Sequence, residues 1–155
     1  CSRGYLVRAF REMGYDAWGM DCSTWAIENA DEIAKPYLHL SGGSEIHGNF
    51  SWIIAKDSLE HVEKIDFLIN EILHRASLGI FVVVPLSPKC NMAYVCPDYE
   101  KDVTHFWRLD LPEWARMFMQ PGWVVEARYR LPWIKQNWYQ PGMEWGNGFL
   151  VAKRV

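Results

Sequence analysis

The chain has 155 residues, half of them hydrophobic, which is enough to build the core of a single α/β domain over residues 1–155. Its formal net charge of −3 comes from interspersed charges with no basic stripe, so nothing indicates nucleic acid as a partner. The longest apolar run, residues 78–86, is too short to span a bilayer and is no signal peptide, so we expect no membrane association and a cytoplasmic protein.

Apolar positions at helical spacing predict four helices. The expected ranges are 3–13, 24–35, 59–76 and 110–119. Gly14 follows the first range as a C-terminal glycine would, whereas Ser23 can cap the second helix, which must end before Pro36.

Short apolar or alternating runs predict the strands. The expected ranges are 17–20, 37–40, 50–55, 80–84, 123–131 and 148–152. Because helices alternate with buried strands, the sequence predicts a mostly parallel sheet flanked by helices. Residues 87–109 form a long connection, and connections of that length in a compact domain are usually functional.

The first residues carry the clearest functional signal. The turn Cys1-Ser2-Arg3-Gly4 opens a helix, and Asp21 ends the short strand that follows it, an arrangement that binds nucleoside-bearing cofactors. Two simpler explanations stay open: Gly4 is an ordinary turn glycine, and Asp21 merely caps the next helix. Dinucleotide dehydrogenases share both features, because they bind the same ribose group.

The order of elements resembles that of class I S-adenosylmethionine-dependent methyltransferases over nearly the whole chain. Residues 1–4 match the second half of the family's turn acid-x-Gly-x-Gly-x-Gly, and Asp21 matches the acid that accepts from the ribose hydroxyls. The last two strands resemble the antiparallel hairpin that closes the family's sheet. The resemblance therefore implies an α/β, Rossmann-like, mostly parallel sheet with flanking helices and a C-terminal antiparallel hairpin.

The resemblance also implies a set of cofactor-binding residues for S-adenosylmethionine. They are Cys1, Ser2, Arg3, Gly4, Asp21, Cys22 and Asp57. Asp57 would lie beside the sulfonium, whereas Glu60 and His61 of the characteristic Leu-Glu-His run are expected to anchor the following helix. Many relatives have an acid after the third strand for the adenine amine, where this chain has residues 41–45.

Asp102 and His105 are the candidate catalytic residues. They lie in the long connection after the fifth strand of the family's sheet, and ligands of such sheets bind at the carboxyl ends of the strands. His105 could take a proton from a hydroxyl or amine nucleophile. The alternative is that both side chains only hold the loop in place. Cys90, Cys96 and His105 fit no common zinc spacing, so we expect no metal site, and the four cysteines are predicted to be free thiols.

Tryptophans gather in the two loops that would rim this site. They are Trp107, Trp133, Trp138 and Trp145. Each could form a local core, but together they favour a small organic acceptor. The expected function is methyl transfer to an oxygen or nitrogen of such an acceptor. The alternative is a catalytically inactive or truncated methyltransferase fold that acts as a binding module.

The first strand of the family's sheet is missing from the chain. That strand would lie between the predicted strands 17–20 and 50–55 and would lead into the turn at Cys1. Unpaired backbone groups there would be costly, about 1–3 kcal/mol for each buried group. We expect that the natural protein begins earlier; the alternatives are direct pairing of the two neighbouring strands and a homo-oligomer in which a second copy covers the gap.

Overall fold

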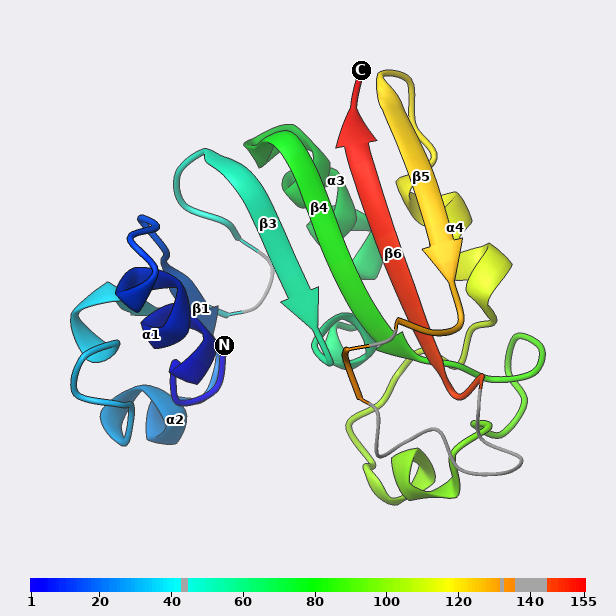
Figure 1. Cartoon of the computed structure of the whole chain (residues 1–155). Coiled ribbons are helices and arrows are strands. Elements are labelled where there is room, and N and C mark those ends of the chain that lie inside the picture. The colour runs from blue at the N-terminus through cyan, green and yellow to red at the C-terminus, as the bar shows by residue number, and fades with distance from the viewer. Residues whose placement is uncertain (43–44, 132, 136–144) are drawn as a thin grey trace. The chain divides into compact units, whose positions relative to one another are not determined.

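The computed structural model describes residues 1–42, 45–131, 133–135 and 145–155. These residues form two compact units, Cys1–Ile46 and His47–Val155, which are described separately below (Figure 1). The expectation of one domain over 1–155 stays a prediction.

The N-terminal unit holds two helices, a 3₁₀ turn and a two-stranded parallel sheet. In chain order these are α1 (Tyr5–Glu12), β1 (Gly19–Asp21), α2 (Thr24–Glu28), the 3₁₀ turn Lys35–Tyr37 and β2 (Leu38–Leu40). The small side chains of Ala30 and Ala34 pack with Val7 and Leu38 to form its core. The predicted helix at 3–13 and both predicted strands are confirmed, within one to two residues at each end.

The second predicted helix is shorter than expected. Ser23 caps it as predicted, its hydroxyl accepting from the Ala26 N–H at 3.2 Å, but α2 ends at Glu28. The reason is local competition: Asp31 Oδ1 accepts from the backbone N–H groups of Ile33 at 3.0 Å and Ala34 at 3.4 Å. Such a side-chain turn replaces the helical hydrogen bonds that the apolar pattern alone suggests.

Gly4 occupies a position that only glycine fits. Its φ is +80°, and an added Cβ would lie 2.7 Å from Ala34 Cβ and 2.8 Å from Leu38 Cδ1. Gly4→Ala should therefore lower the free energy of unfolding by about 2 kcal/mol, from left-handed strain plus overpacking. Gly14→Ala is the control, because φ is +88° there but nothing lies within 4 Å, so strain alone of about 1 kcal/mol is expected. If urea unfolding shows that the two variants lose the same free energy of unfolding, packing at Gly4 is unimportant.

The C-terminal unit is a four-stranded sheet with two helices. Its elements are β3 (Phe50–Lys56), the 3₁₀ turn Leu59–His61, α3 (Ile65–Arg75), β4 (Ala76–Pro85), the 3₁₀ turn Pro97–Lys101, α4 (Leu111–Phe118), β5 (Trp123–Arg128) and β6 (Asn147–Arg154). The strand order is β3-β4-β6-β5, in which β3 and β4 are parallel and β6 is antiparallel to both of its neighbours. The predicted α/β fold and its C-terminal antiparallel hairpin are confirmed.

The two helices of this unit, α3 and α4, contact each other and lie on one face of the sheet (Figure 1). Fully or almost fully buried side chains from the helices and the sheet form the core: Ile69, Ile72, Ile80, Val82, Trp114, Phe118 and Leu150. Helix α4 begins as a helix should, because its N-cap Asp110 accepts from the Glu113 N–H at 3.0 Å. The continuous buried run predicted at 80–84 belongs to the longer strand β4.

The predicted helix at 59–76 is wrong at both ends. Residues Leu59–His61 form a separate 3₁₀ turn, and α3 begins only at Ile65. The long loop takes the carbonyls that a continuous helix would use: Phe106 N donates to Glu60 O at 2.8 Å, and Trp107 Nε1 donates to Val62 O at 2.7 Å. Ala76 already belongs to β4, and β5 ends at Arg128 rather than at residue 131.

In the described residues, β1 pairs with β2 in the N-terminal unit and β3 pairs with β4 in the C-terminal unit. Direct pairing of β1 with β3, one of the outcomes considered from sequence, stays an alternative. No helix in the described part of the chain has the length and apolar character needed to cross a bilayer.

Candidate functional site

The N-terminal turn is held against the end of strand β1 by one carboxylate. Asp21 Oδ2 accepts from the backbone nitrogens of Cys1 at 2.9 Å and Ser2 at 2.7 Å, while Oδ1 accepts from Ser23 N at 2.9 Å. Burial would raise the pKa of Asp21, but these hydrogen bonds together lower it below its usual value. Asp21 is thus ionised at neutral pH and joins the turn to the strand end.

The other residues assigned to the cofactor from sequence lie around this turn or in the second unit. Arg3 Nε donates to Asn29 O at 2.6 Å, and Cys22 is exposed next to Asp21. Gly4 closes the turn through its N–H, which donates to Cys1 O at 3.1 Å. Their roles in cofactor binding stay predictions. Gly43 and Ser44, in the loop where relatives bind adenine, lie outside the described residues.

The C-terminal unit contains a polar pocket of about 350 Å³. It is lined by Lys56, Asp57, Glu60, His61, Asp98, Tyr99, Asp102, His105 and Lys135. These residues come from the end of β3, the two 3₁₀ turns and the loops, so the pocket includes the carboxyl end of a parallel strand, where ligands of such sheets bind. Three residues selected from sequence, Asp57, Asp102 and His105, are brought together here.

Asp57 is the most constrained residue of the pocket. Its φ is +48°, and its N–H donates to Val83 O of the neighbouring strand at 2.9 Å. A non-glycine residue in the left-handed region is uncommon and costs energy that the surroundings must offset. The carboxylate lies 2.5 Å from Lys56 Nζ through Oδ2 and 2.5 Å from Lys135 Nζ through Oδ1.

Lys135 extends this ion pair into a buried network. Besides Asp57, its ammonium donates to Tyr99 Oη at 3.0 Å and to Asn147 Oδ1 at 2.9 Å. Tyr99 Oη in turn donates to Asn147 Oδ1 at 2.6 Å. Burial lowers the pKa of Lys135, which Asp57 opposes, and burial raises the pKa of Tyr99. The network links the end of β3 to the start of β6 and to the turn Pro97–Lys101.

Glu60 and His61 line the pocket. The sequence had suggested instead that they anchor the following helix. Glu60 is 1% exposed, and its Oε2 has no hydrogen-bond partner among the described residues. Burial raises the pKa of this carboxyl to about 7. His61 Nδ1 lies 2.8 Å from Thr104 Oγ1.

Asp102 and His105 occupy different environments within the same loop. Asp102 Oδ1 accepts from the N–H and hydroxyl of Thr104 at 2.9 and 2.6 Å, which lower the pKa of Asp102. His105 is 8% exposed, its Nε2 lies 3.8 Å from Asp102 Oδ2, and its Nδ1 has no partner among the described residues. Burial first, then the nearby His61, lower the pKa of His105. Asp102 therefore holds Thr104 within the loop, while His105 Nδ1 makes no hydrogen bond to the described residues.

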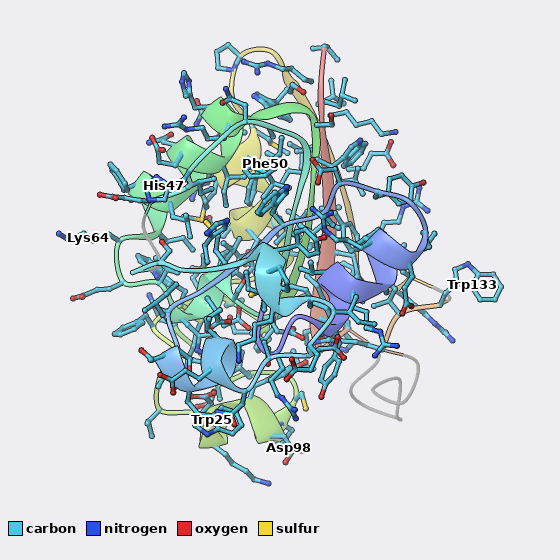
Figure 2. All side chains as sticks on the ribbon, turned by 90° about the vertical axis from the view of Figure 1, so that its left-hand side faces the viewer. Trp25, His47, Phe50, Lys64, Asp98 and Trp133 are labelled. Atoms are coloured by element: carbon cyan, nitrogen blue, oxygen red, sulfur yellow. The ribbon has the colours of Figure 1, made fainter. Side chains whose placement is uncertain are left out.

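The tryptophans do not form a rim around the pocket. Trp107 ties the long loop to Val62, and Trp133 is 86% exposed and projects away from the ribbon (Figure 2). Trp145 is 42% exposed, and Trp138 lies outside the described residues. None of the described tryptophans lines the pocket.

Sequence reasoning missed part of the pocket. Glu60 and His61 were noticed as a characteristic pair but assigned to the helix, and Tyr99 and Lys135 were not selected at all. The sequence did contain a signal that Glu60 and His61 belong to the pocket. Both residues closely follow the end of a predicted strand, where ligands of such sheets bind. Nothing in the local sequence marks Lys135, which meets Asp57 from 78 residues away.

No protein-family model and no curated protein sequence matches the chain significantly. Solved structures do match. The structure of the complex between the Haloferax volcanii Trm112 methyltransferase activator and a methyltransferase matches with a TM-score of 0.75 and 14% identity, over 99% of this chain and 79% of that one.

Two further solved structures are similar over the whole chain. Magnesium protoporphyrin IX methyltransferase from Synechocystis PCC 6803, with bound S-adenosylhomocysteine, has a TM-score of 0.72 at 13% identity, over 100% of this chain and 71% of that one. An S-adenosylmethionine-dependent methyltransferase from Mesorhizobium loti has a TM-score of 0.72 at 13% identity, over 99% of this chain and 88% of that one. The chain therefore has the fold of the class I methyltransferases.

Proposed function

We propose that the chain transfers a methyl group from S-adenosylmethionine to an oxygen or nitrogen of a small-molecule acceptor. The observation that carries the proposal is the polar pocket at the carboxyl end of β3, in a chain with the methyltransferase fold. Similar structures are named as S-adenosylmethionine-dependent, and one holds S-adenosylhomocysteine. Fold alone does not fix function, so the residues of the pocket carry the rest of the argument.

The chemistry asks little of the protein beyond alignment. The sulfonium of the cofactor is already activated, and catalysis rests mainly on holding the nucleophile in line with the methyl group. The acceptor must also lose a proton. His105 lines the pocket with Nδ1 unpartnered, and we propose that this nitrogen assists the removal of that proton. Asp102, 3.8 Å from Nε2, holds the ring orientation.

The cofactor contacts proposed for the N-terminal unit depend on Asp21. Its carboxylate uses three acceptor sites on backbone N–H groups, and a carboxylate offers about four, so at least one ribose hydroxyl can still donate to it. Ser2, Arg3 and Gly4 would bring backbone close to the cofactor. Asp57, in the C-terminal unit, is proposed to lie at its sulfonium end.

Calorimetric titration with S-adenosylhomocysteine tests the cofactor proposal. We expect binding in the micromolar range, weakened by about 30-fold or more in Asp21→Ala, because a charge-assisted hydrogen bond contributes about 1.5–3 kcal/mol. Asp16→Ala is the control, because the side chain of Asp16 is 81% exposed. Thermal unfolding without ligand shows whether Asp21→Ala has merely loosened the turn. Binding of a nicotinamide dinucleotide in place of S-adenosylhomocysteine would move the chain to the dehydrogenases.

A second candidate function is a binding module without turnover. The ion pairs of Asp57 favour this function. Both of its carboxylate oxygens pair with lysines of the chain itself and are therefore less available to a cofactor. A screen of small hydroxylated and amine acceptors, following release of S-adenosylhomocysteine, separates the two functions. Cofactor binding with no turnover on any acceptor would support the module.

A further inference from the structure

Three potential metal ligands converge in the wall of the pocket. One ligating atom from each of Glu60, His61 and His105 lies within 4.8 Å of those of the other two. We propose that these three side chains bind one divalent transition-metal ion. The sequence led us to expect no metal site, because the ligands considered there were Cys90, Cys96 and His105, which fit no common zinc spacing.

Two of the three ligands are buried and unsatisfied. Glu60 is 1% exposed and His105 is 8% exposed, yet Glu60 Oε2 and His105 Nδ1 have no hydrogen-bond partner among the described residues. A buried polar atom without a partner costs about 1–3 kcal/mol and calls for an explanation, such as an ion. Both residues belong to the same cluster, so a single ion bound through these two atoms would satisfy both.

The hydrogen bonds around the cluster orient both imidazoles for metal binding. The Thr104 hydroxyl donates to Asp102 Oδ1 at 2.6 Å, so it accepts from His61 Nδ1 at 2.8 Å, and the lone pair of His61 is left on Nε2. His105 Nε2 lies 3.8 Å from Asp102 Oδ2, and His105 Nδ1 has no hydrogen-bond partner among the described residues, so Nδ1 can take the ion. Carboxylates and hydroxyls behind ligating histidines are the usual supports of metal sites.

The geometry requires only a small closure. Ligands on a tetrahedral zinc ion with bonds of 2.0–2.1 Å lie about 3.3 Å apart, so no separation in the cluster exceeds this by more than about 1.5 Å. Changes of side-chain torsion cover that distance. The His61 and His105 rings already approach to 4.6 Å between centroids at 61°, so both can bind one ion without stacking.

The charge of the pocket favours a cation. Among its lining residues are four acids, Asp57, Glu60, Asp98 and Asp102, and two lysines. Both lysines lie 2.5 Å from the Asp57 carboxylate, which offsets part of their charge. Two imidazoles and one carboxylate suit zinc, iron(II), cobalt or manganese better than magnesium, which prefers oxygen ligands.

Three protein ligands leave coordination positions open toward the pocket. If the proposed methyl transfer holds, on which this step rests, the acceptor binds the ion through an oxygen. A metal ion would lower the pKa of a bound hydroxyl, so that its proton passes to water in the pocket; the oxygen then attacks the methyl carbon as the carbon–sulfur bond breaks, which releases S-adenosylhomocysteine. His105 would then act as a ligand of the ion and not as the proton acceptor, and the acceptor class narrows to hydroxyl compounds.

Calorimetry with zinc chloride on chelator-treated full chain tests the site. We expect one ion per chain in the wild type, bound at least about 100-fold more weakly in Glu60→Gln, His61→Gln and His105→Gln. Thr104→Val removes only the support of His61, and a loss of about 10–100-fold is expected. Glu63→Gln and His74→Gln, both exposed side chains of the same unit, should bind like the wild type.

Cobalt(II) gives a readout that does not depend on activity. Visible absorption of nitrogen- and oxygen-bound cobalt, lost in the three ligand variants, would support the site. Thiolate-to-cobalt absorption that disappears in Cys90→Ser or Cys96→Ser would overturn it, as would zinc binding that survives all three variants or is absent from the wild type. If circular dichroism shows that Glu60→Gln does not fold, metal binding by His61→Gln decides the test, because His61 is partly exposed.

The metal site and the proposed function can fail separately. Turnover by metal-free protein that no metal stimulates would leave methyl transfer standing and overturn the catalytic use of the ion. Zinc bound by the three ligands in a chain that binds no S-adenosylhomocysteine would leave the metal site standing and remove the function.

Discussion

Replacing His105 with glutamine should lower turnover by about 100-fold or more and leave the affinity for S-adenosylhomocysteine nearly unchanged. Glutamine keeps much of the size of the side chain but has no nitrogen that can take a proton or hold an ion. His105 Nδ1 is buried and has no hydrogen-bond partner among the described residues, so the substitution breaks no hydrogen bond at that atom. The measurement is kcat with an acceptor identified in the screen, together with calorimetry of the product cofactor.

The control for this variant is His74→Gln, which places the same substitution on an exposed position of α3. Its turnover should equal that of the wild type. If His105→Gln turns over as fast as the wild type, His105 only anchors the loop, which was the alternative left open by the sequence. Weaker cofactor binding in His105→Gln would mean that the loop itself has moved.

Removing the charge of Asp57 should destabilise the chain strongly. Asp57→Asn keeps the shape and tolerates the φ of +48°, but it removes the carboxylate charge that lies 2.5 Å from the Lys135 ammonium, whose side chain is 7% exposed. Breaking a buried pair costs about 3–5 kcal/mol, and we expect about 3 kcal/mol because Asp57 itself is 30% exposed. Urea unfolding measures the difference.

A double variant shows whether the loss of the charge pair at Lys135 is the cause. Adding Lys135→Met to Asp57→Asn removes the buried ammonium and should restore most of the lost stability. Lys56→Met is the matched control, because the side chain of Lys56 is 45% exposed and such pairs contribute about 0–1 kcal/mol. A double variant as unstable as Asp57→Asn alone would place the cause in the backbone at Asp57 instead.

Much of the fold could be predicted from sequence because its signals are local. The apolar run in β4 and the alternation in β5 each reflect a strand's own surroundings, and Gly14 and Ser23 mark helix ends by their own chemistry. The errors have a different origin. Where the predicted helix at 59–76 breaks, the cause is Trp107, 45 residues away along the chain. No periodicity within the helix could reveal that contact.

In the candidate site, too, some residues could be selected from the order of elements, whereas others depend on contacts that the sequence does not reveal. Asp57, Asp102 and His105 could be selected because parallel strands bring their carboxyl ends to one edge, a rule that needs only the order of elements. Whether Glu60 points toward a helix or a pocket depends on backbone angles after Asp57, whose φ is unusual for its residue type. The place of Lys135 in the pocket depends on tertiary contacts alone. Lys135 follows β5 in sequence, but it contacts Asp57, the residue after β3.

The position of β6 between β4 and β5 has a consequence for the order of folding. Within the described sheet, β5 pairs only with β6, so residues 123–128 have no partner strand until residues 147–154 have left the ribosome. The parallel pair β3–β4 and its helix can associate earlier, because their contacts are closer in sequence. During synthesis the inner edge of β4 stays open until the last strand inserts. An exposed hydrophobic edge of this kind invites pairing with other chains, so slow translation before Asn147 should favour aggregation, and chaperones that shield β4 should favour the native sheet.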